Sequence, residues 1–439
     1  QALTFAILRL VRPLTLALLL PGLLALTRLL ALLPELRLAL PRQELGASGF
    51  YLQSQTTAGQ YRVNFREYEL ARTNGLPDNA DYAAFRFDSA HTLYYPFDVG
   101  ALHVVPRAGA RATWYSRSSA TPVTEGQLSA NFAADNRRGS PGDTSAVTWY
   151  DADGGAQWRW AGEFGLELNC KAQRTWPDFR SALLDMDGLR HTVEPYINYT
   201  YLPEPSDPKD ELYFFDEVDR MDHVNVIRIG LRQQLQTRRG HPRQPTTWLS
   251  LENYFDYFPN PDADQTHAGD FGTILDFTPT DSFDVELKCL VDVHRRRLNV
   301  LSGTTRLGKS SGINASFDYT YRDDHAQRYV YSFGSDLTQI FSSGLFPLTY
   351  DQSRGVSGRL NLPVTDGLKI TANHYYDSDE HELARESYTL KKDLHCWVGE
   401  VGYTRNNDRE LVSVTFYLKA FPQTRLSYDE VLDPEPATE

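Results

Sequence analysis

The sequence GLRHTVEPYINYTYLP, residues 188–203, alternates apolar and polar side chains with the period of a β-strand. The apolar positions are Val193, Pro195, Ile197, Tyr199 and Tyr201. The polar residues between them are Thr192, Glu194, Asn198 and Thr200. The proline is unusual because it cannot donate a backbone N–H, and prolines are confined to strand edges, strand starts and bulges. The stretch therefore predicts a long strand with one apolar face, one polar face and one weakened position.

The same alternation continues from about residue 50 to residue 421. It is clearest at residues 283–293 and 313–322. Further windows with this period lie at residues 61–66, 82–95, 109–118, 223–236, 246–257, 327–334, 366–377 and 410–421. Polar connectors such as residues 136–143 and 203–210 separate them. We therefore predict about 18–22 strands and no amphipathic helix in this part of the chain.

Strand length favours one kind of all-β protein over the others. Many of the predicted strands have ten or more residues, about twice the usual length in soluble sheets. A tilted strand needs about 9–11 residues to cross a bilayer, and lipid requires the sheet to close into a barrel. A soluble sandwich, solenoid or propeller explains the alternation but not the length, and no fixed-period repeat is visible. The predicted fold class is all-β, a large antiparallel transmembrane β-barrel.

Composition is compatible with this fold and argues against two other classes. The formal net charge of −13 gives no basic footprint for nucleic acid. A mean hydropathy of −0.46 argues against a helical membrane protein, whereas a barrel exposes only every second residue to lipid. Aromatic residues make up 12% of the chain, and Tyr and Trp suit membrane interfaces.

Residues 1–48 differ from the rest of the chain, since residues 4–41 consist almost wholly of Leu, Ala, Pro and Arg. The longest uncharged run, Pro13 to Thr27, has 15 residues and contains Pro21-Gly22. A membrane-spanning helix needs about 20 apolar residues. We therefore expect residues 1–48 to be a signal-like or non-native segment rather than a folded element.

Motifs for enzymatic chemistry are missing from the sequence: there is no GxSxG, HExxH, Walker or dinucleotide-binding pattern. Asp262 and Asp264 hint at a calcium loop, but His267 occupies the place where that loop needs glycine. Cys170, Cys289 and Cys396 form no zinc spacing. We predict that the protein is not an enzyme and uses neither a cofactor nor a metal.

Several motifs occur in an order that resembles the barrel region of the LPS-assembly family LptD. Glu194-Pro195 lies in the quoted strand, Asp219-Arg220 in an acidic loop after it, and Asn225 opens the following strand. Upstream resemblances are Arg174 to Pro177 and His91 to Pro96, and a downstream one is His395-Cys396-Trp397. The resemblance covers roughly residues 80–421.

This resemblance implies an outer-membrane translocon of a Gram-negative bacterium that assembles lipopolysaccharide into the outer leaflet. It implies a barrel of about twenty-six strands, of which this chain would hold an incomplete set. The partners implied are lipopolysaccharide, an LptE-like lipoprotein plug in the lumen, periplasmic Lpt bridge components and outer-membrane lipids. The barrel would open sideways between its first and last strands.

The sequence also departs from the family. It lacks an N-terminal jellyroll, so we expect residues 49–421 to be the C-terminal barrel portion of such a protein. Cys396 matches one member of an adjacent cysteine pair that forms disulfides in the family, but His395 occupies the other position. The expected last strand, Leu411–Phe421, would form one side of the gate through Val412, Val414, Phe416 and Leu418. Residues 422–439 are expected to be an acidic tail.

Two other functions stay open at this point. One is a non-specific porin or ligand-gated outer-membrane channel, and the other is a soluble β-rich carbohydrate-active enzyme. Pro195 has two interpretations as well: a tuned weak point in the wall, or a bulge that shapes it. The family's gate lies at the terminal strands, which favours the bulge.

Overall fold

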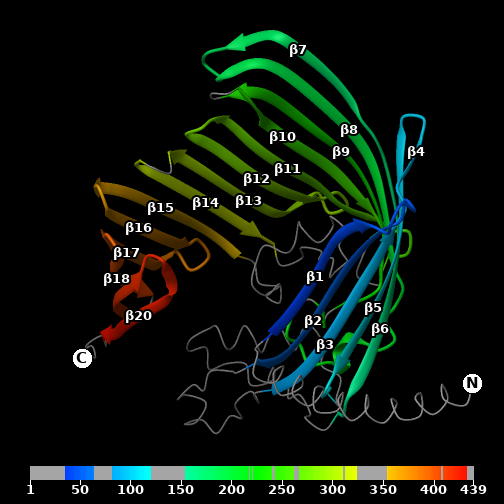
Figure 1. Cartoon of the computed structure of the whole chain (residues 1–439), viewed down its shortest axis with the longest axis horizontal. Helices are drawn as coiled ribbons and strands as arrows, with labels where there is room; N and C mark the ends of the chain where they lie inside the picture. The colour runs from blue at the N-terminus through cyan, green and yellow to red at the C-terminus, as the bar shows by residue number, and fades with distance from the viewer. Residues whose placement is uncertain are drawn as a thin grey trace, which may run out of the picture. The chain divides into compact units, whose positions relative to one another are not determined.

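The computed structural model describes residues 35–63, 82–119, 154–216, 218–219, 221–239, 243–261, 266–309, 312–323, 353–406 and 409–432. Within these ranges the chain forms 20 β-strands, joined in antiparallel pairs, and one 3-10 turn, η2, at Lys209–Glu211 (Figure 1). The predicted all-β antiparallel fold class and strand number are confirmed. No helix in the described ranges is long and apolar enough to span a membrane.

The first ten strands are β1 Glu35–Glu44, β2 Tyr51–Val63, β3 Tyr82–Tyr94, β4 Phe97–Val99, β5 Leu102–Tyr115, β6 Gln157–Cys170, β7 Ala172–Ser181, β8 Met186–Leu202, β9 Val224–Arg239 and β10 Gln244–Tyr257. The other ten are β11 Ala268–Thr280, β12 Phe283–Asp292, β13 Arg297–Gly308, β14 Asn314–Arg322, β15 Ser353–Thr365, β16 Leu368–Asp377, β17 Glu382–Leu394, β18 Trp397–Asn406, β19 Arg409–Leu418 and β20 Phe421–Leu432.

Most strands pair with their neighbours in sequence. β1 pairs with β2, β2 with β3, and every strand from β9 to β19 with the one after it. β3 and β4 both pair with β5, and β6 and β7 both pair with β8. The register keeps like faces together: Leu301 lies opposite Tyr321 on the apolar side, and Ser302 lies opposite Thr320 on the polar side. The sequence alternation thus becomes one continuous apolar face and one polar face along each run of strands.

The described residues fall into two compact units. Unit 1 contains the described residues up to 167 and residues 198–226, and unit 2 contains residues 168–197 and the described residues from 227 onward. The apolar clusters of unit 1 lie where residues 203–223, between β8 and β9, pack onto the sheet.

Burial is inverted with respect to a soluble protein. In unit 1, Arg159 and Glu163 of β6 are 1% and 0% exposed, whereas the intervening Trp160 is 59% exposed. In β8, Asn198 is 4% exposed and its neighbour Ile197 is 40% exposed. Soluble proteins bury their apolar side chains and leave charged ones in water. Here the charged face is covered and the apolar face is exposed.

Pro195 lies on the exposed apolar side of β8, as predicted. The pairing of β7 with β8 ends at Ala172 opposite Val193, and β6 and β7 are separated by Lys171 alone. Continuing that register places Pro195 opposite Cys170, the last residue of β6, next to the interruption at Lys171. The missing N–H of the proline therefore coincides with an interruption in the neighbouring strand, which agrees with the bulge-like interpretation.

Two segment predictions are wrong or only partly right, and a third, the strand at residues 327–334, stays a prediction. Glu35–Glu44 forms β1 within the supposed signal-like segment 1–48, because its pairing with β2 gives its backbone partners. Phe421–Leu432 forms β20 instead of an acidic tail, since Leu426 and Tyr428 continue the alternation opposite Phe416 and Val414. Residues 327–334 lie outside the described residues.

The expected last strand is consequently an inner one among the described strands. Val412, Val414, Phe416 and Leu418 lie in β19, which pairs with β18 on one side and β20 on the other. The prediction that they form the last strand is therefore wrong, and their place beside a gate stays a prediction. The last position among the described strands belongs to β20.

Candidate functional site

Residues 203–223 of unit 1 cover the polar face of β3, β5 and β6. Their aromatic side chains pack against the start of β3, where the rings of Tyr82 and Tyr213 stack with centroids 5.1 Å apart. The Tyr82 hydroxyl donates a 2.6 Å hydrogen bond to the carbonyl oxygen of Phe214. At the other side of the segment, Met221 packs with Ala90 and Leu202. We call residues 203–223 the covering segment.

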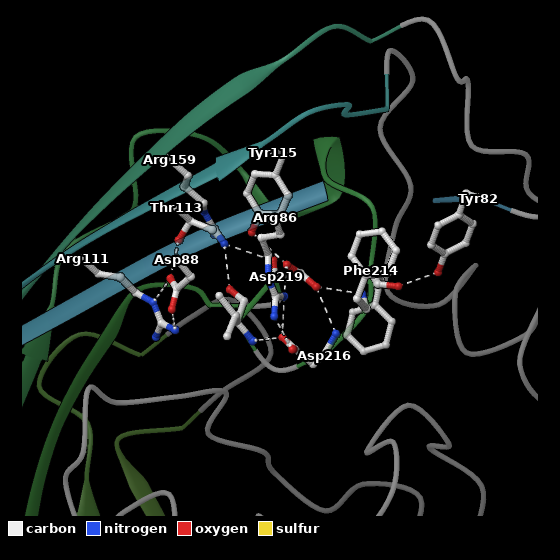
Figure 2. A network of polar contacts seen from close by, with 12 residues as sticks. Tyr82, Arg86, Asp88, Arg111, Thr113, Tyr115, Arg159, Phe214, Asp216 and Asp219 are labelled. Atoms are coloured by element: carbon white, nitrogen blue, oxygen red, sulfur yellow. Dashed lines mark hydrogen bonds and ion pairs between the residues drawn. The ribbon is translucent and has the colours of Figure 1, made fainter. Parts of the chain in front are cut away.

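Asp219 is the centre of the polar contacts that hold the covering segment (Figure 2). Its Oδ1 accepts from Arg86 Nη1 at 2.7 Å and from the Tyr115 hydroxyl at 2.8 Å. Its Oδ2 accepts from the backbone N–H groups of Phe215 at 2.7 Å and Asp216 at 3.0 Å. The carboxylate is buried, so these four hydrogen bonds replace its water shell. One side chain thereby ties the segment to both β3 and β5.

Arg159 of β6 fastens the backbone of the covering segment. Its guanidinium donates to the carbonyl oxygens of Asp207 at 3.0 Å, Val218 at 3.3 Å and Asp219 at 3.1 Å, and to that of Met221. The rigid fork of an arginine suits such a set of acceptors better than the single ammonium of a lysine. Because the four carbonyls come from both halves of the segment, Arg159 fixes its fold as well as its position.

Two further buried ion pairs continue the network along the polar face of unit 1. Arg111 donates to both oxygens of Asp88, at 2.6 and 2.7 Å. Arg107 donates to Glu163 at 2.8 Å. A Cβ at Gly165 would lie 2.3 Å from Arg107 Cζ, so a larger residue there would have to displace the Arg107 guanidinium from its contact with Glu163. These pairs make the covered face rigid, since each charge depends on its partner in a buried environment.

Unit 2 carries a similar network on its own polar face. Arg228 donates to both oxygens of Asp256, at 2.7 and 2.8 Å, and lies 3.8 Å above the ring of Tyr254. Arg232 lies between Glu194 at 3.4 Å and Glu252 at 3.3 Å. Charged pairs therefore line the polar faces of both units.

Two carboxyl groups of the covering segment have shifted pKa values. Burial raises the pKa of Asp219, although the adjacent Arg86 acts in the opposite direction. For Asp222, burial would raise the pKa, but the hydrogen bond and charge of Lys209 outweigh it, so the pKa lies below its usual range. The Lys209 ammonium lies 2.7 Å from Asp222 Oδ2. Asp222 is thus a second, half-exposed ionic contact within the segment.

The structure separates the motif residues predicted from the sequence. Asp219 lies at the centre of the unit 1 network, whereas Glu194 and Pro195 belong to unit 2. Arg220 lies outside the described residues. Asn225 is in β9, and its side-chain oxygen is buried with no hydrogen-bond partner among the described residues. Asp219 thus belongs to the polar network of unit 1 and Glu194 to that of unit 2.

The cysteines form no disulfide in the described part of the chain, which contains all three. Cys396 is exposed in the turn between β17 and β18, and Cys170 and Cys289 are half-buried. Among the described ranges, no group of three or more His, Cys, Asp or Glu residues is placed to hold a metal ion.

Sequence reasoning missed Arg86, Tyr115 and Arg159, the main partners of the covering segment. Arg86 and Asp219 are 133 residues apart in the chain, and Arg159 and Asp219 are 60 apart. The only local signal was a charged residue on the polar side of each alternating strand. That signal does not indicate which residue each charged side chain pairs with.

Comparisons with known proteins add structural similarities alone. No family model and no curated protein matches the chain. A mutant of the ferric enterobactin receptor PfeA from Pseudomonas aeruginosa matches 88% of this chain and 61% of its own length, at 9% identity and a TM-score of 0.39. The siderophore receptor PirA from Acinetobacter baumannii matches 90% of this chain and 63% of its own, at 10% identity and a TM-score of 0.39. The chain thus spans less than two thirds of these receptors, and no family is assigned from them.

Proposed function

We propose that this chain is an outer-membrane β-barrel that passes a solute through a lumen lined by its charged face. The observation that carries the proposal is the inverted burial: Trp160 is exposed beside the buried Arg159 and Glu163. An exposed apolar face of this extent has no stable place in water but matches the hydrocarbon core of a bilayer.

Strand length and the need to pair the backbone groups of the edge strands support the same proposal. β8 and β9 have 17 and 16 residues, more than the roughly 9–11 needed to cross a bilayer. In lipid every backbone N–H and C=O group needs a protein partner. A long sheet of antiparallel neighbours supplies these partners by closing on itself, which is why we propose a barrel.

The covering segment favours a gated channel over an open pore. It occupies the polar face of β3, β5 and β6, and the buried Arg86–Asp219 ion pair and the hydrogen bonds of Arg159 hold it there. A solute moving along that face would have to pass or displace the segment. We therefore place a ligand-gated outer-membrane channel first among the functions considered.

Lipopolysaccharide assembly is the second candidate. It rests on the resemblance carried by Glu194-Pro195, Asp219 and Asn225, and on the central position that Asp219 takes in the network. With it come the proposed partners: lipopolysaccharide, an LptE-like plug lipoprotein and the periplasmic Lpt bridge. A charged face that accepts an anionic sugar head suits this candidate as well.

One pair of measurements separates the two candidates. We expect the full chain, refolded into planar bilayers, to give discrete conductance steps that a bound solute alters. A photoreactive residue at Leu426 of β20 would trap lipopolysaccharide in cells only if the second candidate holds. Conductance without a lipopolysaccharide adduct supports the channel. An adduct without conductance favours the assembly function over the channel. The absence of both conductance and adduct contradicts both candidate functions.

A further inference from the structure

An arginine cluster lies at one end of β7–β10, in unit 2. It consists of Arg180, Arg238, Arg239 and Arg243. Three of these guanidinium groups surround the single carboxylate of Asp187, with Arg180 at 3.3 Å, Arg238 at 3.8 Å and Arg243 at 3.0 Å. With Asp185 and Asp281, which lie near Arg239, the cluster brings four guanidinium groups against three carboxylates, in a chain whose net charge is −13. Arg180 and Arg243 are largely exposed, so their remaining donors are available to a ligand.

Arg239 completes the cluster from a buried position. Its Nε lies 3.2 Å from Asp185 Oδ2, and its Nη2 donates to the carbonyl oxygen of Thr278 at 2.9 Å. Its Nη1 has no hydrogen-bond partner among the described residues and lies 3.9 Å from the exposed carboxylate of Asp281. The cluster therefore combines one buried arginine with more exposed ones around it.

A row of aromatic side chains adjoins the cluster. The Trp248 indole N–H donates to the carbonyl oxygen of Leu184 at 3.1 Å, in the turn next to Asp185. The ring of Trp248 packs edge-on against that of Phe277, with centroids 4.7 Å apart. The rings of Phe277 and Phe283 also pack edge-on, with centroids 6.4 Å apart. Phe277 is paired with Leu249 and Val285, so it belongs to the apolar face. Aromatic rings beside basic residues are typical of the boundary between hydrocarbon and headgroups.

The turns identify which boundary this is. Residues 182–185 and 281–282 make short turns at this end of the strands, whereas residues 258–267 join β10 to β11 at the other end. Outer-membrane barrels carry their short turns on the periplasmic side. The cluster would thus face the leaflet of glycerophospholipids.

We infer that the arginine cluster binds the phosphate of an anionic phospholipid headgroup, with the acyl chains against the aromatic row. The inference rests on the proposed barrel function. Guanidinium groups bind phosphate oxygens through paired hydrogen bonds, and the excess of positive charge gives the site its preference for an anionic lipid. Asp187 pairs with both Arg180 and Arg243 and so keeps their guanidinium groups near each other.

The test is lipid binding by the refolded full chain in detergent, followed by native mass spectrometry with phosphatidylglycerol and phosphatidylcholine. We expect selective binding of phosphatidylglycerol, weakened roughly tenfold or more in the double variant Arg180→Gln/Arg243→Gln. The matched control, Arg306→Gln/Arg385→Gln, removes two arginines from other strands and should keep the wild-type affinity. Equal binding by both double variants would overturn the inference.

Competition between the bound lipid and inorganic phosphate identifies whether the site takes a lipid headgroup or a soluble phosphate. Millimolar inorganic phosphate that leaves the lipid bound supports a headgroup site, whereas complete displacement overturns it in favour of a soluble phosphate ligand. Heat-modifiable gel migration keeps the two proposals apart. A variant that migrates as a folded barrel but shows no lipid selectivity contradicts only the headgroup site, and a wild-type chain that never shows folded migration contradicts the barrel.

Discussion

The substitution Asp219→Asn is expected to free the covering segment and raise the conductance of the refolded protein. The amide keeps the size of the carboxylate but loses its charge and one of its two acceptor oxygens. The new NH2 group must face either Arg86 and the Tyr115 hydroxyl or the N–H groups of Phe215 and Asp216, so one of these two pairs of donors loses its acceptor. Removing one member of a buried ion pair costs about 3–5 kcal/mol, and Arg86 keeps Asp216, so we expect about 3 kcal/mol.

Trypsin provides a direct readout of this release. Lys209 lies within the covering segment and is paired with Asp222. In the Asp219→Asn variant we expect cleavage after Lys209 at least about tenfold faster than in the wild type, since about 3 kcal/mol corresponds to more than a hundredfold change in opening. Conductance should rise in the same samples.

Asp222→Asn is the matched control for Asp219→Asn. It removes a carboxylate from the same segment and leaves the Asp219 network intact. Because the Asp222–Lys209 pair is half-exposed, its loss should cost no more than about 1 kcal/mol. Equal cleavage and equal conductance in the two variants would show that the network does not hold the segment.

The substitution Phe317→Lys is expected to prevent stable insertion into lipid vesicles. Phe317 is 55% exposed on the apolar face, near the middle of β14. A lysine at the bilayer midplane of a barrel costs about 2–4 kcal/mol. We expect the folded fraction on a heat-modifiability gel to fall sharply and the free energy of unfolding to drop by that amount.

Thr320→Lys is the control on the opposite face of the same strand. Thr320 is exposed on the polar side, where the proposed lumen is wet, so a lysine there should leave the folded fraction nearly unchanged. If the sheet as observed stood in water, both exposed positions would be solvated and both lysines would be tolerated. Equal tolerance would therefore argue for the soluble alternative.

Local alternation predicted most of the fold. The windows 223–236 and 246–257 correspond to β9 at Val224–Arg239 and β10 at Gln244–Tyr257, because the period of two needs no knowledge of partners. β20 was missed since Asp429 and Glu430 made its sequence look like a solvated tail. β1 was missed because its leucines and arginines continue the composition of the preceding segment. In both cases pairing with a neighbouring strand decided the structure.

The candidate site was predictable only in part. Asp219 was singled out through its motif, although nothing local shows that its carboxylate is buried. Arg86 and Arg159 are brought to it by the tertiary structure, across 133 and 60 residues. The arginine cluster has the same character, since Arg180 of β7 and Arg243, which precedes β10, meet at Asp187. Contacts of this kind depend on register and strand order, which one sequence does not contain.

The central claim is that the apolar face meets lipid while the polar face meets water. Spin labels placed one at a time at residues 315–321 of β14, in a variant without native cysteines, test it most directly. In vesicles the account predicts that labels at Ala315, Phe317, Tyr319 and Tyr321 are accessible to oxygen dissolved in the bilayer. Labels at Ser316, Asp318 and Thr320 should be accessible to a water-soluble nickel complex instead. Nickel accessibility at every position, with no period of two, would contradict the account.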